Sequence, residues 1–142
     1  MHNQTSININ PYLTFPGNCK EAMIFYKDAS NGELEMLPYS ESPMDLPPDH
    51  ADKILHATLN FGNGVIMAAD AMPGQEVTNG NSIHISIAAP NLDEAKNLFT
   101  KLSTGGTIIM PFEKVFWGAT FGMFADKFGI NWMINSEPEE TK

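Results

Sequence analysis

Apolar residues recur at helical spacing in two segments that share the same start and stop signals. The first segment runs from Asn18 to Gly32, and the second runs from Asn91 to Gly105. In both, Asn occupies the N-cap position and Glu follows three residues later, which is typical of a helix start. The glycine at the end of each segment is typical of a helix stop. The apolar positions are Ala22, Phe25, Tyr26 and Ala29 in the first and Ala95, Leu98, Phe99 and Leu102 in the second. The pattern predicts two equivalent amphipathic helices.

Strand-like runs surround the two predicted helices in the same order, one run before each helix and three after it. The expected strands cover residues 7–15, 33–39, 53–61 and 65–70, and then 83–89, 107–111, 116–125 and 130–135. Gly62-Asn63-Gly64 predicts a hairpin. This order predicts an α+β fold in which a βαβββ module occurs twice, at about 5–72 and 81–136 of a single domain spanning 1–142. A single irregular α+β sheet carrying two unrelated capped helices is the alternative.

Alternation along the predicted strands separates an apolar face from a polar one. The apolar sets, expected to pack on the helices, include Leu55, Ala57, Leu59 and Phe61, and also Ile83, Ile85 and Ile87. The opposite face is expected to carry His56, Thr58, Asn60, Met67, His84, Ser86, Asn131 and Met133. A surface with a few convergent polar groups is the usual form of a small-molecule site. The alternatives are that this face is solvated or covered by a partner subunit.

Two histidines on the polar face are the candidates for acid–base chemistry or metal binding. His56 and His84 could each act as a general base or a ligand, and each could equally be a half-buried structural histidine. Neither has an obvious carboxylate partner on the same face, so we assign no catalytic residue. Cys19 lies at a helix N-terminus, which tends to lower the pKa of a thiol, but no histidine neighbours it to form a nucleophilic pair.

The charge balance excludes several kinds of partner. The chain of 142 residues has 42% hydrophobic and 18% charged residues, as a globular protein does, and a formal net charge of −9. Without a cluster of Lys or Arg, we expect it to bind neither nucleic acid nor an anionic membrane. The first ten residues do not form a signal peptide, no stretch is long enough to span a bilayer, and Cys19 is the single cysteine. These features predict a cytoplasmic protein.

Two blocks of sequence resemble a known family. The first contains Asn10-Pro11-Tyr12-Leu13-Thr14-Phe15, Gly17-Asn18-Cys19, Glu21-Ala22 and Phe25-Tyr26. The second contains Met110-Pro111, Phe116-Trp117-Gly118, Phe121-Gly122-Met123-Phe124 and Asp126-Lys127-Phe128-Gly129-Ile130-Asn131-Trp132. Together they cover nearly the whole chain and resemble the PhnB-like branch of the vicinal-oxygen-chelate (glyoxalase/bleomycin-resistance/dioxygenase) superfamily. The resemblance implies paired βαβββ modules, a curved, mostly antiparallel sheet around a pocket, and a homodimer.

The resemblance also implies where a metal would bind. The metal enzymes of the superfamily carry one ligand on the first and one on the fourth strand of each module, which corresponds to Pro11, Met67, His84 and Met133 here. Only His84 offers a donor that suits a divalent cation. We therefore expect no cofactor, with a divalent metal as the less favoured alternative. The methyltransferase label common in this branch does not suit a chain this short, which lacks a glycine-rich cofactor loop.

The favoured function is a small-molecule binder with a degenerate metal site and an unknown ligand. Its expected wall comprises His56, Thr58, Asn60, Met67, His84, Ser86, Asn131 and Met133, with Trp117 and Phe116 as aromatic lids. Trp117 could instead be a core or interface anchor. The net negative charge favours a cationic ligand. The alternatives are a divalent-metal lyase, isomerase or dioxygenase that uses His84 and His56, and an interaction module without a ligand.

Overall fold

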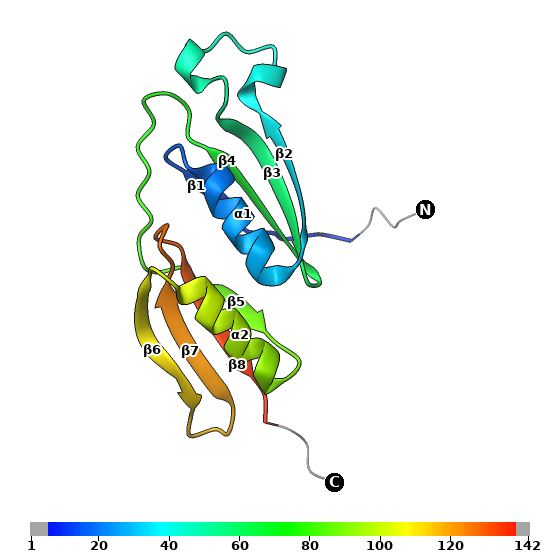
Figure 1. Ribbon diagram of the computed structural model, residues 1–142, viewed down its shortest axis with the longest axis vertical. Helices are drawn as coiled ribbons and strands as arrows, with labels where there is room; N and C mark the ends of the chain where they lie inside the picture. The colour runs from blue at the N-terminus through cyan, green and yellow to red at the C-terminus, as the bar shows by residue number, and fades with distance from the viewer. Residues whose placement is uncertain (1–5, 139–142) are drawn as a thin grey trace. The chain divides into compact units, whose positions relative to one another are not determined.

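The computed structural model describes residues 6–138, in which the chain divides into two compact units between Val77 and Thr78 (Figure 1). Each unit contains one long helix and one four-stranded sheet, and the element order is the same in both. The expected α+β fold with two βαβββ modules is confirmed. The expected module limits of about 5–72 and 81–136 fall within these units, except that residue 5 lies outside the described residues.

The first unit arranges its strands in the order β1-β4-β3-β2. Its elements are β1 (Tyr12–Phe15), α1 (Cys19–Ser30), β2 (Glu33–Pro38), β3 (Ile54–Phe61) and β4 (Gly64–Asp70). β1 and β4 are parallel, and the other pairs are antiparallel. Two short 3-10 helices, η1 (Tyr39–Glu41) and η2 (Pro48–His50), interrupt the connection from β2 to β3. The expected hairpin forms, because Phe61 pairs with Gly64 across Gly62 and Asn63.

The second unit repeats this arrangement in the order β5-β8-β7-β6. Its elements are β5 (Ile85–Ala88), α2 (Leu92–Ser103), β6 (Thr107–Lys114), β7 (Thr120–Ala125) and β8 (Asn131–Ser136). β5 and β8 are parallel, and the other pairs are antiparallel. Register shifts interrupt the β6–β7 ladder on both sides of Met110. Each unit thus has one parallel and two antiparallel strand pairs.

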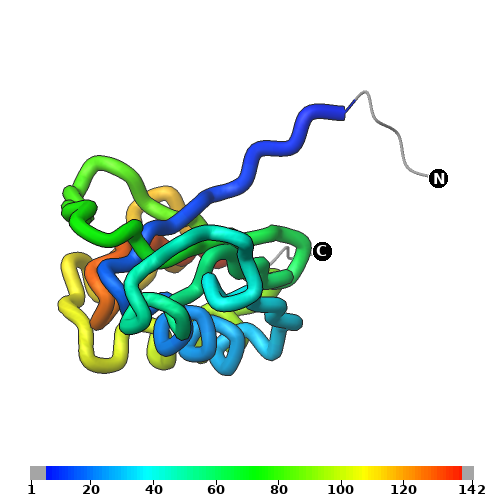
Figure 2. Tube along the Cα trace, turned by 90° about the horizontal axis from the view of Figure 1, so that it is seen from above, coloured from blue at the N-terminus to red at the C-terminus, as the bar shows by residue number. Residues whose placement is uncertain are grey.

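Several expected strand limits are wrong at their ends. Residues 6–11 form an extended segment without strand pairing (Figure 2), and Ile7 and Ile9 are 88% and 91% exposed. β7 begins at Thr120 rather than at residue 116, because the chain turns where the Val115 amide donates to the Ala119 carbonyl at 2.8 Å. The apolar residues at these ends continue the sequence pattern of a strand, although their backbones do not pair with a neighbouring strand.

Helix α1 covers one face of the first sheet (Figure 1). The buried side of the helix carries Cys19, Ala22, Met23, Tyr26 and Ala29, so Met23 takes the buried place that the sequence assigned to Phe25. The sheet meets it with Ala57, Leu59, Ile66 and Ala68, all buried. Leu55 is only half-buried, because a register shift between Leu37 and Pro38 places Ile54 in the core instead.

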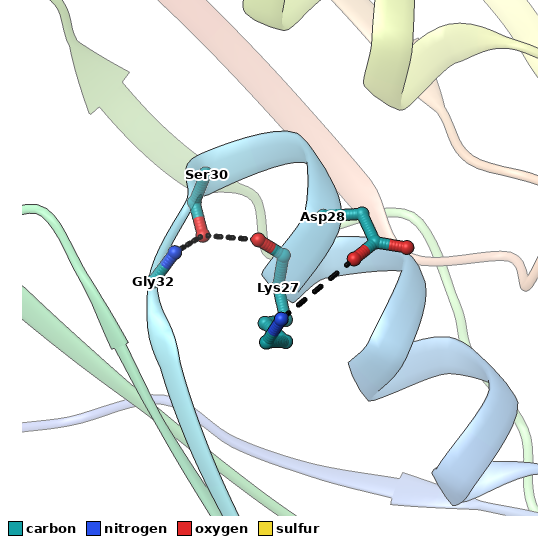
Figure 3. Close-up of polar contacts among 4 residues, drawn as sticks. All are labelled: Lys27, Asp28, Ser30 and Gly32. Carbon is teal, nitrogen blue, oxygen red and sulfur yellow. Dashed lines mark hydrogen bonds and ion pairs between the residues drawn. The ribbon is translucent and has the colours of Figure 1, made fainter.

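The end of α1 depends on a close approach and not only on backbone freedom. The left-handed residue there is Asn31, with φ 55°. The Ser30 hydroxyl donates to the Lys27 carbonyl at 3.3 Å and accepts from the Gly32 amide at 3.1 Å, next to the Lys27–Asp28 pair (Figure 3). A Cβ at Gly32 would overlap the carbonyl oxygen of Asn60. Gly32 is therefore needed because the chain passes directly against β3.

The second unit has an aromatic core. Phe99 of α2 packs edge-on against Phe124 at 5.1 Å between ring centroids, and Phe124 stacks on Trp132 at 6.4 Å. Trp132 is fully buried, and its indole N–H donates to the Asp126 carboxylate at 2.8 Å. The same carboxylate accepts from the amides of Phe128 and Ile130, which fixes the turn between β7 and β8.

The two predicted helix caps behave differently. In α2 the Asn91 side chain accepts from the Glu94 amide at 2.8 Å, which confirms that cap. In α1 the Asn18 side chain makes no capping bond, and its buried Oδ1 has no hydrogen-bond partner in the described residues. There the Cys19 amide donates instead to the carboxylate of Asp70, at 2.9 Å. A tertiary contact thus replaces the local cap.

Candidate functional site

A chain of hydrogen bonds crosses the face of the first sheet that points away from α1. The Tyr12 hydroxyl lies 3.1 Å from Nδ1 of His56, and the Thr58 hydroxyl lies 3.1 Å from Nε2. Tyr12 comes from β1 and the other two from β3, and the Tyr12 and His56 rings are tilted at 5.7 Å between centroids. Both imidazole nitrogens are therefore engaged. We call the surface formed by Tyr12, Glu35, His56, Thr58 and Met67 the His56 face.

Strand register explains why these residues meet. Tyr12 pairs with Met67, Met67 with Thr58, and Thr58 with Glu35. Paired residues of neighbouring strands point to the same side of a sheet, so the four form a row across all four strands. Asn60 lies beyond this row at the exposed end of β3, where it pairs with Val65 and Glu33. The expected grouping of His56, Thr58 and Met67 on one face is present.

The protonation of Tyr12 limits how the chain of hydrogen bonds can be arranged. Burial raises the pKa of the Tyr12 phenol above its ordinary value, and a charge on nearby Cys19 would raise it further. The phenol is thus protonated at neutral pH. A neutral imidazole carries one N–H, so one of its nitrogens donates and the other accepts. Either tautomer fits the two distances to His56.

The second sheet carries a row of a different kind. Ser86 pairs with Met133, Met133 with Met123, and Met123 with Met110. These residues alternate with Trp132 and Phe124, which face the helix side, so the row lies on the face away from α2. Met123 and Met133 are half-buried and Met110 is 40% exposed. We call the surface formed by Ser86, Met110, Met123 and Met133 the methionine face.

Two residues expected on this face, and one expected on the helix-facing side, are placed differently. His84 is half-buried and precedes β5, and the residue that pairs with Met133 is Ser86. Asn131 is 8% exposed and donates from Nδ2 to the carbonyls of Gly80 and Ile83, at 3.1 and 3.3 Å. Its amide therefore ties the preceding loop to β8. Ile83, expected to face the helix, is 82% exposed, because the strand starts only at Ile85.

The two candidate lid residues lie in the turn between β6 and β7. Phe116 and Trp117 are 95% and 54% exposed in the described structure, which contradicts the alternative of Trp117 as a core residue. Their rings meet edge-on at 4.9 Å between centroids, and Trp117 contacts Phe121 at 6.1 Å. The three rings form an exposed aromatic cluster. An aromatic surface of this kind can stack on a flat ligand or hold a cation.

The residues at the metal positions implied by the resemblance do not fit a hard or borderline divalent ion. Pro11 has no donor side chain, and its carbonyl is used by the Met67 amide at 3.0 Å. Met67 and Met133 offer thioethers, which suit soft metals. His84 is the one suitable ligand of the four. Among residues 6–138, no three His, Cys, Asp or Glu side chains gather into a group that could hold a metal ion.

Cys19 is shielded rather than activated by its position. The side chain is fully buried, and burial, with a further contribution from the charge of Asp70, raises the pKa of the thiol to about 12. The lowering expected from the helix N-terminus is wrong here, because desolvation of a thiolate outweighs the helix dipole. Cys19 is a core residue of the first unit.

Sequence reasoning missed Tyr12, Glu35, Met110 and Met123. Tyr12 and Met123 are part of the two blocks that resemble the family, but no periodicity in the sequence shows which residues of separate strands are paired. The alternation of β1 and β7 would have put both on the correct face. Met110 could not have been placed this way, because a bulge next to it changes the alternation.

Comparison with known proteins identifies relatives along the whole chain. Residues 7–135 match the family described as 3-demethylubiquinone-9 3-methyltransferase. Protein YjdN of Escherichia coli is 31% identical over 89% of this chain and 93% of its own length. The crystal structure of protein PA1353 from Pseudomonas aeruginosa covers 94% of this chain and 100% of its own, with 43% identity and a TM-score of 0.86.

More distant structures show how widely the fold is shared. A Bacillus cereus PhnB protein, described as a putative 3-demethylubiquinone-9 3-methyltransferase, has 23% identity and a TM-score of 0.77, over 92% of this chain and 99% of its own. A glyoxalase/bleomycin resistance protein/dioxygenase family enzyme from Burkholderia phytofirmans has 13% identity and a TM-score of 0.59, over 88% and 95%. In residues 6–138, no helix is long and apolar enough to cross a membrane.

Proposed function

The chain belongs to the PhnB-like family described as 3-demethylubiquinone-9 3-methyltransferase, with the glyoxalase/bleomycin-resistance fold, and from this membership we propose that it binds a small molecule without a divalent metal. The observation that carries the proposal is the hydrogen-bond chain Tyr12–His56–Thr58 on the His56 face. These groups recognise the ligand. The methyltransferase description is not part of the proposal, because neither unit has the doubly wound parallel sheet of a nucleotide-binding fold.

Proton counting shows what the chain offers to a ligand. If the imidazole N–H is on Nε2, Tyr12 donates to Nδ1, Thr58 accepts from Nε2, and the Thr58 hydroxyl proton is left over. If the N–H is on Nδ1, Thr58 donates to Nε2 and the Tyr12 proton is left over. In both tautomers one hydroxyl proton is not used in the hydrogen bonds that link Tyr12, His56 and Thr58. The His56 face therefore provides one directed hydrogen-bond donor for a ligand oxygen or nitrogen.

The charge of the surrounding strands indicates the charge of the proposed ligand. β1, β2, β3 and β4 contain no Lys or Arg. Glu35 pairs with Thr58 and Glu33 with Asn60, so two exposed carboxylates lie along the His56 face. A cationic ligand is favoured there, and an anionic ligand is repelled. We propose a planar cation with one hydrogen-bond acceptor, with Met67 providing a polarizable contact.

We propose that the second unit offers contacts of its own to a small molecule, separately from the His56 face. Ser86 and Met133 lie on the methionine face, His84 precedes β5, and Phe116 and Trp117 are part of the exposed aromatic cluster, whereas Asn131 is buried and its amide is used by the preceding loop. The aromatic faces suit a flat cation by stacking and by cation–π attraction. No catalytic role is proposed for any of these residues, and no cofactor is needed for binding.

We also propose that the protein is a cytoplasmic homodimer. Ile108 and Ile109 on the edge strand β6 are 52% and 53% exposed, and an exposed apolar edge strand is a natural surface for a partner subunit. Light scattering after size exclusion tests this. A mass near twice 15.6 kDa supports a dimer, and a mass of one chain contradicts it.

Ligand binding is tested by thermal shift with two probes that share a ring system. 1-Methylnicotinamide is a planar cation with one carbonyl acceptor, and nicotinate is a planar anion of similar size. We expect the cation alone to raise the melting temperature in a dose-dependent way. Thr58→Val and His56→Ala should weaken its binding roughly tenfold, the effect of losing one hydrogen bond of about 1.4 kcal/mol. The control is Asp28→Ala, at an exposed position on α1.

Two results would overturn this proposal. The first is stabilisation by the anion and the cation alike, or by neither. The second is a divalent metal that co-purifies at one equivalent per chain, resists dialysis, and is lost in His84→Ala or His56→Ala. That result would favour the metal-dependent lyase, isomerase or dioxygenase instead.

A further inference from the structure

The methionine face brings three thioethers to neighbouring positions on three neighbouring strands. Met133 of β8 pairs with Met123 of β7, and Met123 pairs with Met110 of β6. Directly opposed residues in a sheet have Cβ atoms about 5 Å apart. The unbranched methionine side chain has three rotatable bonds, so its sulfur can move toward a common centre without a change in the backbone.

The chemistry of this row differs from that of any hard-metal site. Thioether sulfur is a soft, neutral donor that selects Cu(I) over Mn, Zn or Mg. Met133 occupies a position at which the superfamily resemblance implies a metal ligand, and it makes a poor ligand for those divalent ions. With Met123 and Met110 beside it, the same residue becomes one of three donors of matching softness. Methionine at position 133 therefore disfavours a site for a hard or borderline divalent ion and favours a site for a soft ion.

The surroundings of the row admit a cation. Met110 is 40% exposed, so an ion can enter from the β6 edge, while Met123 and Met133 are half-buried. One step along the same face, Phe121 pairs with Glu113 and with Asn135, so an aromatic ring, a carboxylate and an amide flank the row without a basic group. The net charge of −9 also favours a cation.

We propose that Met110, Met123 and Met133 form a binding site for one soft monovalent cation, Cu(I). The ion would be held by three thioether sulfurs, with the ring of Phe121 nearby. This inference goes beyond the proposed function, because it concerns an ion in the second unit and requires neither the His56 face nor an organic ligand.

The test is a competition titration of the full-length protein. Cu(I) is supplied as its bicinchoninate complex under reducing conditions, and transfer to the protein is followed by the loss of colour. We expect uptake of one equivalent per chain, and an affinity at least tenfold lower in Met123→Leu. Leucine keeps the volume of methionine but lacks the sulfur, so the fold should be retained. Met44→Leu, in a loop of the first unit, is the matched control and should bind as the wild type does.

Methyl NMR identifies the ligands directly. The chain contains nine methionines, and one equivalent of Ag(I), a soft ion that air does not oxidise, should shift the ¹³C-methyl signals of three of them, Met110, Met123 and Met133. Shifts at other methionines, or unchanged Cu(I) affinity in Met123→Leu, would overturn the proposal. Uptake that survives Met123→Leu and disappears in Cys19→Ala would assign the ion to the thiol and would also overturn it. If Met123→Leu does not fold, the exposed Met110→Leu gives the same comparison.

Discussion

Removal of the Asp70 carboxylate should be among the most destabilising changes in the first unit. Asp70 is 3% exposed at the end of β4. One carboxylate oxygen accepts from the Cys19 amide at 2.9 Å, and the other accepts from the Ile54 amide at 2.8 Å. This one side chain therefore joins the start of α1, the start of β3 and the end of β4.

The magnitude follows from these two bonds. A hydrogen bond to a charged group stabilises a protein by about 1.5–3 kcal/mol, so Asp70→Ala should cost about 3–6 kcal/mol in the free energy of unfolding. Two buried amides would lose their acceptor, and the Asn18 side chain does not replace it at the helix start. Asp70→Asn keeps one acceptor oxygen and should cost about half as much. Since domains are stable by only about 5–15 kcal/mol, the alanine variant should be close to unfolding.

Urea denaturation followed by circular dichroism measures both variants against the wild type. Asp28→Ala is the matched control, because the Asp28 side chain is 71% exposed and its ion pair with Lys27 spans 4.0 Å, so the change should stay within about 0.5 kcal/mol. A loss below about 1 kcal/mol in Asp70→Ala would refute the reasoning, since it would mean that the two amides find other acceptors at little cost.

Three further changes test the cores of the two units. Between pH 9 and 12 the free energy of unfolding should fall as the pH rises. The reason is that the thiol ionises in the unfolded chain, whereas burial raises the pKa of Cys19 to about 12 in the folded one. Urea titrations at several pH values should show a flatter slope in Cys19→Ala. Gly32→Ala should cost about 1–3 kcal/mol, because the added Cβ meets the Asn60 carbonyl, whereas Gly62→Ala meets no atom and suffers only the strain of φ 58°. Leu102→Ala, at a fully buried position of α2, should cost about 2–5 kcal/mol by chemical denaturation, and an effect no larger than that of an exposed site would contradict its placement in the core.

The repeated βαβββ order could be predicted because it rests on local signals. Asn91 caps α2 as expected, and the buried positions Ala95, Phe99 and Leu102 recur with the period of a helix. Hairpin turns such as Gly62-Asn63 are equally local. These features depend on residues within a few positions of one another, so the sequence contains the information needed to locate them.

Contacts between distant residues could not be predicted in the same way. The start of α1 is held by Asp70, 51 positions further along the chain, and not by the favourable cap residue Asn18. Tyr12 reaches His56 across 44 positions, because β1 and β3 both pair with β4 and lie on either side of it. The pKa of Cys19 is raised instead of lowered for the same reason, since the burial of the thiol depends on the packing of α1 against the sheet.

The two units show how one backbone plan can carry two different chemistries. The row across the first sheet is Tyr12, Met67, Thr58 and Glu35, and the equivalent row across the second is Ser86, Met133, Met123 and Met110. Methionine on the fourth strand is the member that the rows share. The pairing of strands is set by the helix-facing residues, such as Leu59 with Ile66 and Phe124 with Trp132, which must pack together. The opposite face is released from that requirement, so hydrogen-bonding groups can occupy it in one unit and thioethers in the other without a change of fold.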